Sequence, residues 1–282
     1  MKFINLLLEQ IDELYPFPEI AHRVLELSKK TDSKMSEIAN VIQYDPMITA
    51  DIIRMSNSAY FGISRKVETL KDAISVLGLD RIINLVLMKC GSKNLKGPQP
   101  GYDLAEGSLW KKSASAAIIA EKIAKEKNPE FKSRVFTAAL LRDIGKVVLG
   151  QYVANKKEKI QFLIEQSSFS FDEAEKKVFG IDQGELSTLV VKKWGFPDEM
   201  VLIVKNSFNP KGGAKFQMES DIVYFAHNIC LMLGFGVGSD GLAYRFDENV
   251  MKRLNFQHKT IEKMMAEFTD SIKDLEELIE SV

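Results

Sequence analysis

The stretch Leu140-Leu141-Arg142-Asp143-Ile144-Gly145-Lys146 places two adjacent charges inside an otherwise apolar segment. Residues 131–150 have helical periodicity, and Ala138 and Ala139 are small enough to let this helix pack closely on a neighbour. A partly buried carboxylate is costly unless it has a partner, so Asp143 needs a cation or hydrogen-bond donors beside it. The stretch therefore predicts a core helix that carries a polar site.

Helical periods and helical end signals continue along nearly the whole chain, and convincing alternating strands are few. Asp45 followed by Pro46 is typical of an N-cap with proline at the first helical position, and Gly62 suits a left-handed helix exit. We expect another helix start near Ser33. The remaining helices are expected near residues 46–56, 70–77, 82–88, 110–125, 156–166, 171–178, 183–193, 198–207, 218–233 and 258–279. The pattern predicts an all-α, multi-helical fold.

The chain has one stretch dense in glycine and proline, residues 93–101. Such a composition is typical of a connection between compact parts. We therefore divide the chain into an amino-terminal helical half, residues 1–97, and a second helical half with the carboxy-terminal helices, residues 98–282.

Several short phrases in a fixed order resemble one family. They are Tyr15-Pro16-Phe17-Pro18-Glu19-Ile20, Tyr44-Asp45-Pro46-Met47-Ile48, Met55-Ser56-Asn57-Ser58-Ala59-Tyr60-Phe61-Gly62, Ala73-Ile74-Ser75-Val76-Leu77-Gly78, Leu109-Trp110-Lys111-Lys112-Ser113, the 140–146 stretch, Gly180-Ile181-Asp182-Gln183 and Lys193-Trp194-Gly195-Phe196-Pro197. Over roughly residues 14–210 the chain resembles the HDOD family, bacterial signalling proteins whose domain is related to the HD phosphohydrolases. The resemblance implies an amino-terminal helical half packed on an HD-like helical half.

An HD-type hydrolase needs imidazoles and carboxylates that converge on a divalent ion. This chain has three histidines in total, far apart in sequence. Where metal-competent relatives carry histidine, it has Lys112, Arg142 and Gln183, and the last acidic position of the pattern falls near His227. We therefore expect neither a metal nor another cofactor. The resemblance implies a vestigial site made of Lys112, Arg142, Asp143, Gln183 and His227.

The residue types at this site suggest what replaces the metal. Arginine stays protonated in proteins and cannot coordinate a cation, so Arg142 would repel a divalent ion. One hypothesis is that Lys112 or Arg142 forms an internal salt bridge with Asp143. The alternative is that both cations point into solvent and Asp143 caps or hydrogen-bonds a neighbouring helix end.

Composition indicates a globular protein without a strong global field. The formal net charge is −1, which gives no overall attraction to nucleic acid or to anionic lipid. The apolar start of the chain is too short, and too acidic behind, for a signal peptide or a membrane span. Cys90 and Cys230 form no Cys-x-x-Cys pattern, which favours a reduced, cytoplasmic setting.

Three function classes follow. We favour a non-catalytic signal-transduction or regulatory module, a pseudoenzyme that binds a protein partner or a small anionic ligand held by Lys112 and Arg142. The first alternative is a metal-dependent phosphohydrolase with unrecognised ligands. The second is a DNA-associated regulator, because residues 35–56 have a helix-turn-helix outline, but its second helix offers little more than Arg54 as a base. We therefore expect no nucleic acid and no membrane among its partners.

Overall fold

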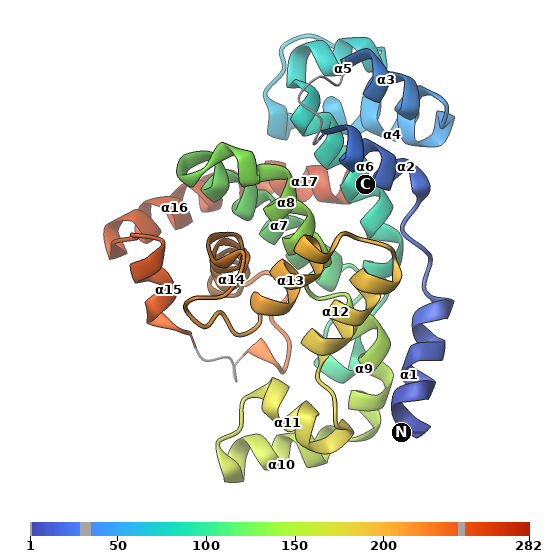
Figure 1. Cartoon of the computed structure of the whole chain (residues 1–282). Helices are drawn as coiled ribbons and strands as arrows, with labels where there is room; N and C mark the ends of the chain where they lie inside the picture. Colours follow the sequence, from blue (N-terminus) through green and yellow to red (C-terminus); the bar gives the residue numbers. More distant parts are fainter. Residues whose placement is uncertain (1, 29–34, 242–245) are drawn as a thin grey trace. The chain divides into compact units, whose positions relative to one another are not determined.

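A computed structural model describes residues 2–28, 35–241 and 246–282, and these residues form helices and turns without a β-strand (Figure 1). The all-α prediction is confirmed. The start predicted at Ser33 lies outside the described residues. Among the described residues, no helix combines the length and the apolar character that crossing a membrane would require.

The contacts divide the chain into two compact units, one of residues 1–16 and 94–262, and one of residues 17–93 and 263–282. The boundary between the predicted halves, 1–97 and 98–282, lies close to the boundary between the two units at residue 94. The halves differ from the units at both chain ends, because residues 1–16 belong to the larger unit and residues 263–282 to the smaller one. Within the larger unit, Asn94 holds Tyr15 through two hydrogen bonds: its Oδ1 accepts from the Tyr15 amide at 3.0 Å, and its Nδ2 donates to the Tyr15 carbonyl at 2.9 Å. Within the smaller unit, Lys89 Nζ donates to the carbonyl oxygen of Val282 at 3.0 Å.

The smaller unit is built from short helices with clear end signals. Its helices are α2 (Glu19–Ser28), α3 (Met35–Gln43), α4 (Pro46–Ser56), α5 (Leu70–Leu77) and α17 (Ile272–Ser281), together with most of α6 (Leu79–Leu95) and of α16 (His258–Asp270). Asp45 caps α4 by accepting from the amides of Met47 and Ile48, each at 3.0 Å. Gly62 ends a short 3-10 turn with φ +59°. Both predicted end signals are confirmed.

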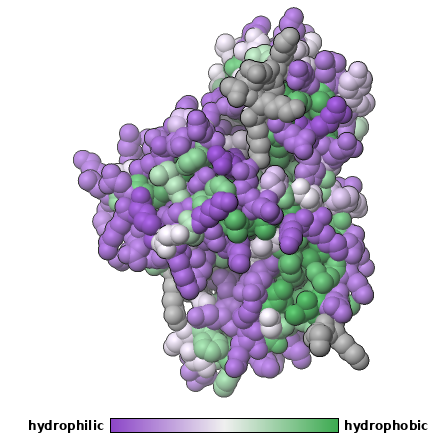
Figure 2. Space-filling view, in the orientation of Figure 1, coloured by the Kyte–Doolittle hydropathy of each residue, from purple (hydrophilic) through white to green (hydrophobic). Residues whose placement is uncertain are grey.

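The larger unit contains the helices that position the candidate site. They are α1 (Lys2–Glu13), α7 (Ser108–Lys127), α8 (Lys132–Leu141), α9 (Gly145–Asn155), α10 (Lys157–Ser167), α11 (Phe171–Phe179), α12 (Gln183–Lys193), α13 (Asp198–Asn206), α14 (Gln217–Met232) and α15 (Glu248–Arg253). Helices α7, α8 and α14 pack on one another, and α12 packs on α9 and α13. Helix α1 lies on α9, where Figure 2 shows hydrophobic side chains gathered on a mostly hydrophilic surface.

Two predicted helices are each divided in two. The helix expected over 131–150 ends at Leu141, turns through Arg142–Ile144 and begins again at Gly145. The turn lets Gly145 approach α12 closely: its amide donates to Ser187 Oγ at 2.8 Å, and an added Cβ would lie 2.0 Å from the Gln183 carbonyl oxygen. The helix expected over 258–279 is interrupted at Ser271, whose hydroxyl donates to the Glu267 carbonyl at 3.0 Å. Helix α15 was not predicted.

Candidate functional site

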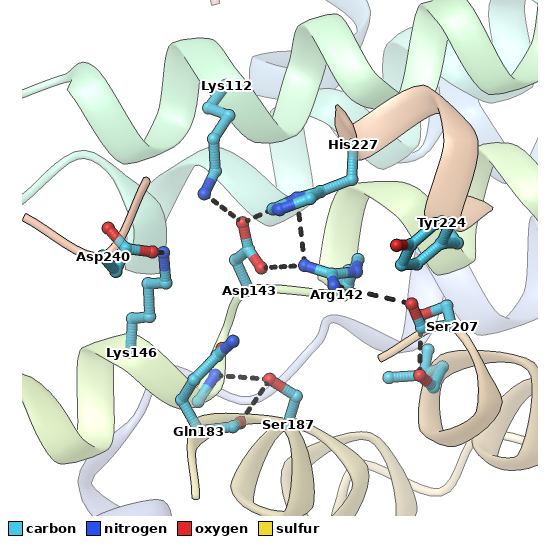
Figure 3. Close-up of polar contacts among 12 residues, drawn as sticks. Lys112, Arg142, Asp143, Lys146, Gln183, Ser187, Ser207, Tyr224, His227 and Asp240 are labelled. Carbon is cyan, nitrogen blue, oxygen red and sulfur yellow. Dashed lines mark hydrogen bonds and ion pairs between the residues drawn. The ribbon is translucent and has the colours of Figure 1, made fainter. Parts of the chain in front are cut away.

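The turn between α8 and α9 places Asp143 in the interior of the larger unit (Figure 3). Because α8 packs on α7 and on α14, the side chains of Lys112 from α7 and His227 from α14 reach the same place. Figure 3 shows Lys112, Arg142 and His227 pointing toward the Asp143 carboxylate from three sides.

Both oxygens of the Asp143 carboxylate have a cationic partner. Lys112 Nζ lies 2.6 Å from Oδ2, and Arg142 Nη1 donates to Oδ1 at 2.8 Å. His227 Nδ1 lies 3.6 Å from Oδ2 and 2.9 Å from Arg142 Nη1. Since a guanidinium only donates, Nδ1 of His227 is the acceptor in that contact. The predicted internal salt bridge is therefore present, and it involves both cations rather than one.

Gln183, the remaining residue of the predicted site, is also fully buried but is held by α11 and α12. Its backbone amide donates to a carboxylate oxygen of Glu175 at 2.8 Å, and its carbonyl accepts from Ser187 Oγ at 2.9 Å. Glu175 in turn accepts from the Tyr102 hydroxyl at 2.6 Å. Gln183 thus links α12, which packs on α9, to a second buried polar group formed by Glu175 and Tyr102.

Sequence reasoning missed a second buried ion pair. Lys146 Nζ lies 2.5 Å from Asp240 Oδ2, both side chains are buried, and the ammonium lies 5.0 Å from the centre of the Tyr102 ring. Lys146 stands three residues after Asp143 in the 140–146 stretch, so the sequence indicated that it could lie near this carboxylate. Asp240 gave none, because it follows a glycine-rich turn that is distant in sequence. The cluster therefore has three cations, Lys112, Arg142 and Lys146, for two carboxylates, Asp143 and Asp240.

Burial and the neighbouring charges together set the pKa values of Asp143, Lys112 and His227. Burial raises the pKa of Asp143, but the charges of Lys112, Lys146 and Arg142 hold that pKa well below its usual range. Burial lowers the pKa of Lys112, although Asp143 opposes this effect. Burial and then Arg142 lower the pKa of His227 well below its usual range, so its imidazole is neutral near pH 7.

The pKa values of the second pair move in the opposite sense to what burial alone would give. Burial lowers the pKa of Lys146, but Asp240 and then Asp143 raise it above its ordinary value. Burial raises the pKa of Asp240, but Lys146 and then Lys112 bring it below its ordinary value. Both members are therefore charged, and the pair supports Asp143 electrostatically.

These residues do not fit the divalent ion that an HD-type site would hold. Both carboxylate oxygens of Asp143 are engaged, one by an ammonium and one by a guanidinium, and His227 Nδ1 accepts from the same guanidinium. Within residues 2–28, 35–241 and 246–282, no group of three or more histidine, cysteine or acidic side chains is arranged to hold a metal. A cation placed against Asp143 would meet fixed positive charge instead of ligand lone pairs.

Beside the cluster lies an open cleft of about 850 Å³, with Arg142 and His227 on its inner wall. Its other walls come from α11, the start of α12, α14, and the segment after α13. They are lined by Phe169, Ser170, Asp172, Glu173, Lys176, Lys177, Asp182, Glu185, Phe208, Asn209, Pro210, Tyr224, Asn228 and Asp247. Lys112 is fully buried and is not among the lining residues. The two cations expected to hold an anionic ligand are thus already paired, and only one of them lines the cleft.

The fold and the charge cluster together define an all-helical protein whose polar centre is built from buried ion pairs. The chain belongs to the HDOD family, because the HDOD domain matches residues 14–210. The resemblance found in the sequence is thereby confirmed.

Solved structures agree with this fold. A crystal structure of an HDOD domain protein of unknown function from Geobacter sulfurreducens matches with a TM-score of 0.78, at 20% identity, over 100% of this chain and 97% of that one. A candidate phosphohydrolase from Shewanella amazonensis SB2B matches with a TM-score of 0.70, at 20% identity, over 98% and 97% of the two chains. Identities this low show a shared fold and no more.

One candidate signal transduction protein and one curated relative are longer than this chain. The first, from Marinobacter aquaeolei VT8, matches with a TM-score of 0.75 at 21% identity, over 95% of this chain and 60% of its own. The second, an uncharacterized protein of Treponema pallidum (strain Nichols), is 19% identical over 77% of this chain and 42% of its own length. The chain thus spans less than half of that curated relative.

Proposed function

We propose that this chain is a non-catalytic signal-transduction module, in which a buried charge cluster stands where an HD hydrolase holds its metal, and that it acts by binding a protein partner. The observation that carries the proposal is the Asp143 carboxylate, whose two oxygens lie 2.6 Å from Lys112 Nζ and 2.8 Å from Arg142 Nη1. Two fixed cations against this carboxylate repel a divalent ion and occupy the places where further ligands would stand.

Physical chemistry makes this replacement self-consistent. Loss of a metal from a buried site would leave Asp143 uncompensated, and an unpaired buried charge costs several kcal/mol. Lys112 and Arg142 remove that penalty, and Lys146 with Asp240 extends the same network. The site can therefore keep its fold without an ion, which is what a binding module needs and a metal-dependent hydrolase does not.

A protein partner fits the cluster better than a small anion does. The anion version requires Lys112 and Arg142 as ligand-binding cations, but both already pair with Asp143, and Lys112 is fully buried. Signalling by binding is also consistent with the fold that this chain shares with the candidate signal transduction protein from Marinobacter aquaeolei.

The proposal is tested by assays of turnover. The purified chain is incubated with manganese, iron or zinc ions and with bis(p-nitrophenyl) phosphate, p-nitrophenyl phosphate or a cyclic dinucleotide, beside the Asp143→Asn variant. We expect the two proteins to be indistinguishable from the metal-only blank. Metal-dependent hydrolysis that the Asp143→Asn substitution abolishes would instead make the chain an enzyme with substituted ligands.

A further inference from the structure

The cleft beside the charge cluster has an excess of carboxylates. Among the described residues that line it, five are acidic, Asp172, Glu173, Asp182, Glu185 and Asp247, and three are basic, Arg142, Lys176 and Lys177. Of the basic groups, Arg142 already pairs with Asp143 and Lys176 with Glu185. Among the described lining residues, this leaves four carboxylates and one further cation, Lys177.

Three of these four carboxylates have identifiable structural roles. Asp182 accepts from the amide of Glu185 at the start of α12, and Asp247 accepts from the amide of Asn249 at the start of α15. Glu173 accepts from the amide of Ser170 in the capping box of α11. These donors are neutral backbone groups, so none of these three hydrogen bonds supplies a counter-charge to the cleft.

Asp172 is different from the other three. Asp172 lies in the first turn of α11 and is partly exposed to the cleft, and its inner oxygen, Oδ1, accepts no hydrogen bond from any residue that the structure describes. The charges of Arg142 and Lys146 are offset by those of Asp182 and Asp240, so burial dominates and raises the pKa of Asp172 to about 6. A buried acceptor without a donor is destabilising by itself, and a cationic group beside this carboxylate would offset that cost.

The walls around these carboxylates are aromatic. Phe169, Phe208 and Tyr224 line the cleft, and one face of Phe208 is covered by the Arg142 guanidinium, 4.0 Å from the ring centre. Aromatic and methylene surfaces pack well together, and ring faces attract cations. A lysine or arginine side chain combines an apolar stem with a cationic head that matches this lining.

We infer that the cleft binds a basic segment of the protein partner, with a lysine or arginine side chain inserted between the aromatic walls so that its head pairs with the Asp172 carboxylate. A volume of about 850 Å³ accommodates more than one side chain, as expected for a peptide segment and not for a lone ion. The inference rests on the proposed function, since it names the chemistry of the partner.

The test uses capped tripeptides and the whole chain. The probes are N-acetyl, C-amidated Gly-Lys-Gly and Gly-Arg-Gly, the neutral isostere with norleucine, the acidic Gly-Glu-Gly, and free spermidine. Ligand-observed NMR measures the affinity of each. We expect the basic peptides to bind in the millimolar range, the norleucine and glutamate peptides to bind at least about tenfold more weakly, and the affinity to fall with added salt.

A pair of matched variants tests the assigned acceptor. Asp172→Asn keeps the shape of the side chain and removes its charge, and it should weaken binding of the lysine peptide by about tenfold or more. Glu165→Gln removes an exposed charge from α10, outside the cleft, and should leave the affinity unchanged. Circular dichroism of each variant verifies the fold.

The contrary outcomes are equally specific. The inference is overturned by the absence of basic-peptide binding up to about 10 mM, by equal affinity in the Asp172→Asn variant, or by preferential binding of the acidic peptide. Binding of spermidine without binding of either basic peptide would overturn the partner segment in favour of a free amine. Because peptide binding and phosphodiester turnover are separate readouts, failure of this inference is distinguishable from failure of the proposed function.

Discussion

Asp143 and Lys112 should respond very differently to neutralisation, although they form one ion pair. Asp143→Asn leaves two buried cations, Lys112 and Arg142, without their shared carboxylate. Breaking a buried pair by removing one partner costs about 3–5 kcal/mol. Lys112→Met, by contrast, leaves Asp143 paired with Arg142 at 2.8 Å and removes an ammonium whose pKa burial lowers.

The Lys112→Met variant should therefore lose less than about 1 kcal/mol of unfolding free energy, or gain stability, because a buried charge is replaced by an apolar side chain of similar length. The two variants should differ by at least about 2 kcal/mol, which is a factor of roughly 30 in the unfolding equilibrium. Asp103→Asn is the matched control. It neutralises a carboxylate of the same unit whose ion pair with Lys157 is exposed, and it should change stability by less than about 1 kcal/mol.

Urea denaturation followed by tryptophan fluorescence measures this difference in the unit that contains the cluster. Both tryptophans of the chain, Trp110 and Trp194, belong to the larger unit, so their fluorescence reports on its unfolding. Far-ultraviolet circular dichroism reports on both units. Equal losses for Asp143→Asn and Lys112→Met, or a loss below about 1 kcal/mol for Asp143→Asn, would refute the view that Asp143 is the shared counter-charge of the cluster.

Three further results are expected. Gly145→Ala should lose about 1–3 kcal/mol or more in urea titrations, because its Cβ would overlap α12, whereas Gly97→Ala, with open space around it, should stay near wild type. The folded pKa of Asp172 is about 6 and its ordinary value is 3.8, so the protonated side chain favours the folded state below pH 3.8 and this contribution is lost as the pH rises through 6. Asp172→Asn should therefore gain up to about 3 kcal/mol of unfolding free energy at pH 7 and nothing at pH 3.5. A gain that does not depend on pH would contradict this. The double substitution Lys112→His with Arg142→His would surround Asp143 with imidazoles in place of cations, and calorimetric titration should then detect zinc or manganese binding; a folded double variant without it would show that the cluster's charges are not what excludes the metal.

Part of this structure follows from the sequence because local signals encode it. Helix caps such as Asp45 act through bonds to amides two and three residues away, so their positions are readable from short patterns. The ion pair between Asp143 and Lys112 was predictable for a different reason. An uncompensated carboxylate in an apolar helix demands a cation, and the family phrases placed Lys112 and Arg142 at the positions where it could be supplied.

Other features depend on contacts between distant segments, and no local pattern specifies them. The turn at Arg142–Ile144 brings Gly145 against α12, a contact with a distant segment, whereas apolar periodicity alone continues through it. Asp240 meets Lys146 across a sequence separation of 94 residues. The carboxylates of the cleft come from the starts of three different helices, so their excess over cations was visible only after the fold had brought them together.

The central claim is that fixed cations have replaced a metal at Asp143, and metal stoichiometry tests it most directly. The purified chain is incubated with manganese, iron and zinc ions, freed of excess ion, and subjected to elemental analysis beside its Asp143→Asn variant. We predict much less than one equivalent of any metal on either protein. About one tightly held equivalent that the Asp143→Asn substitution removes would contradict the account.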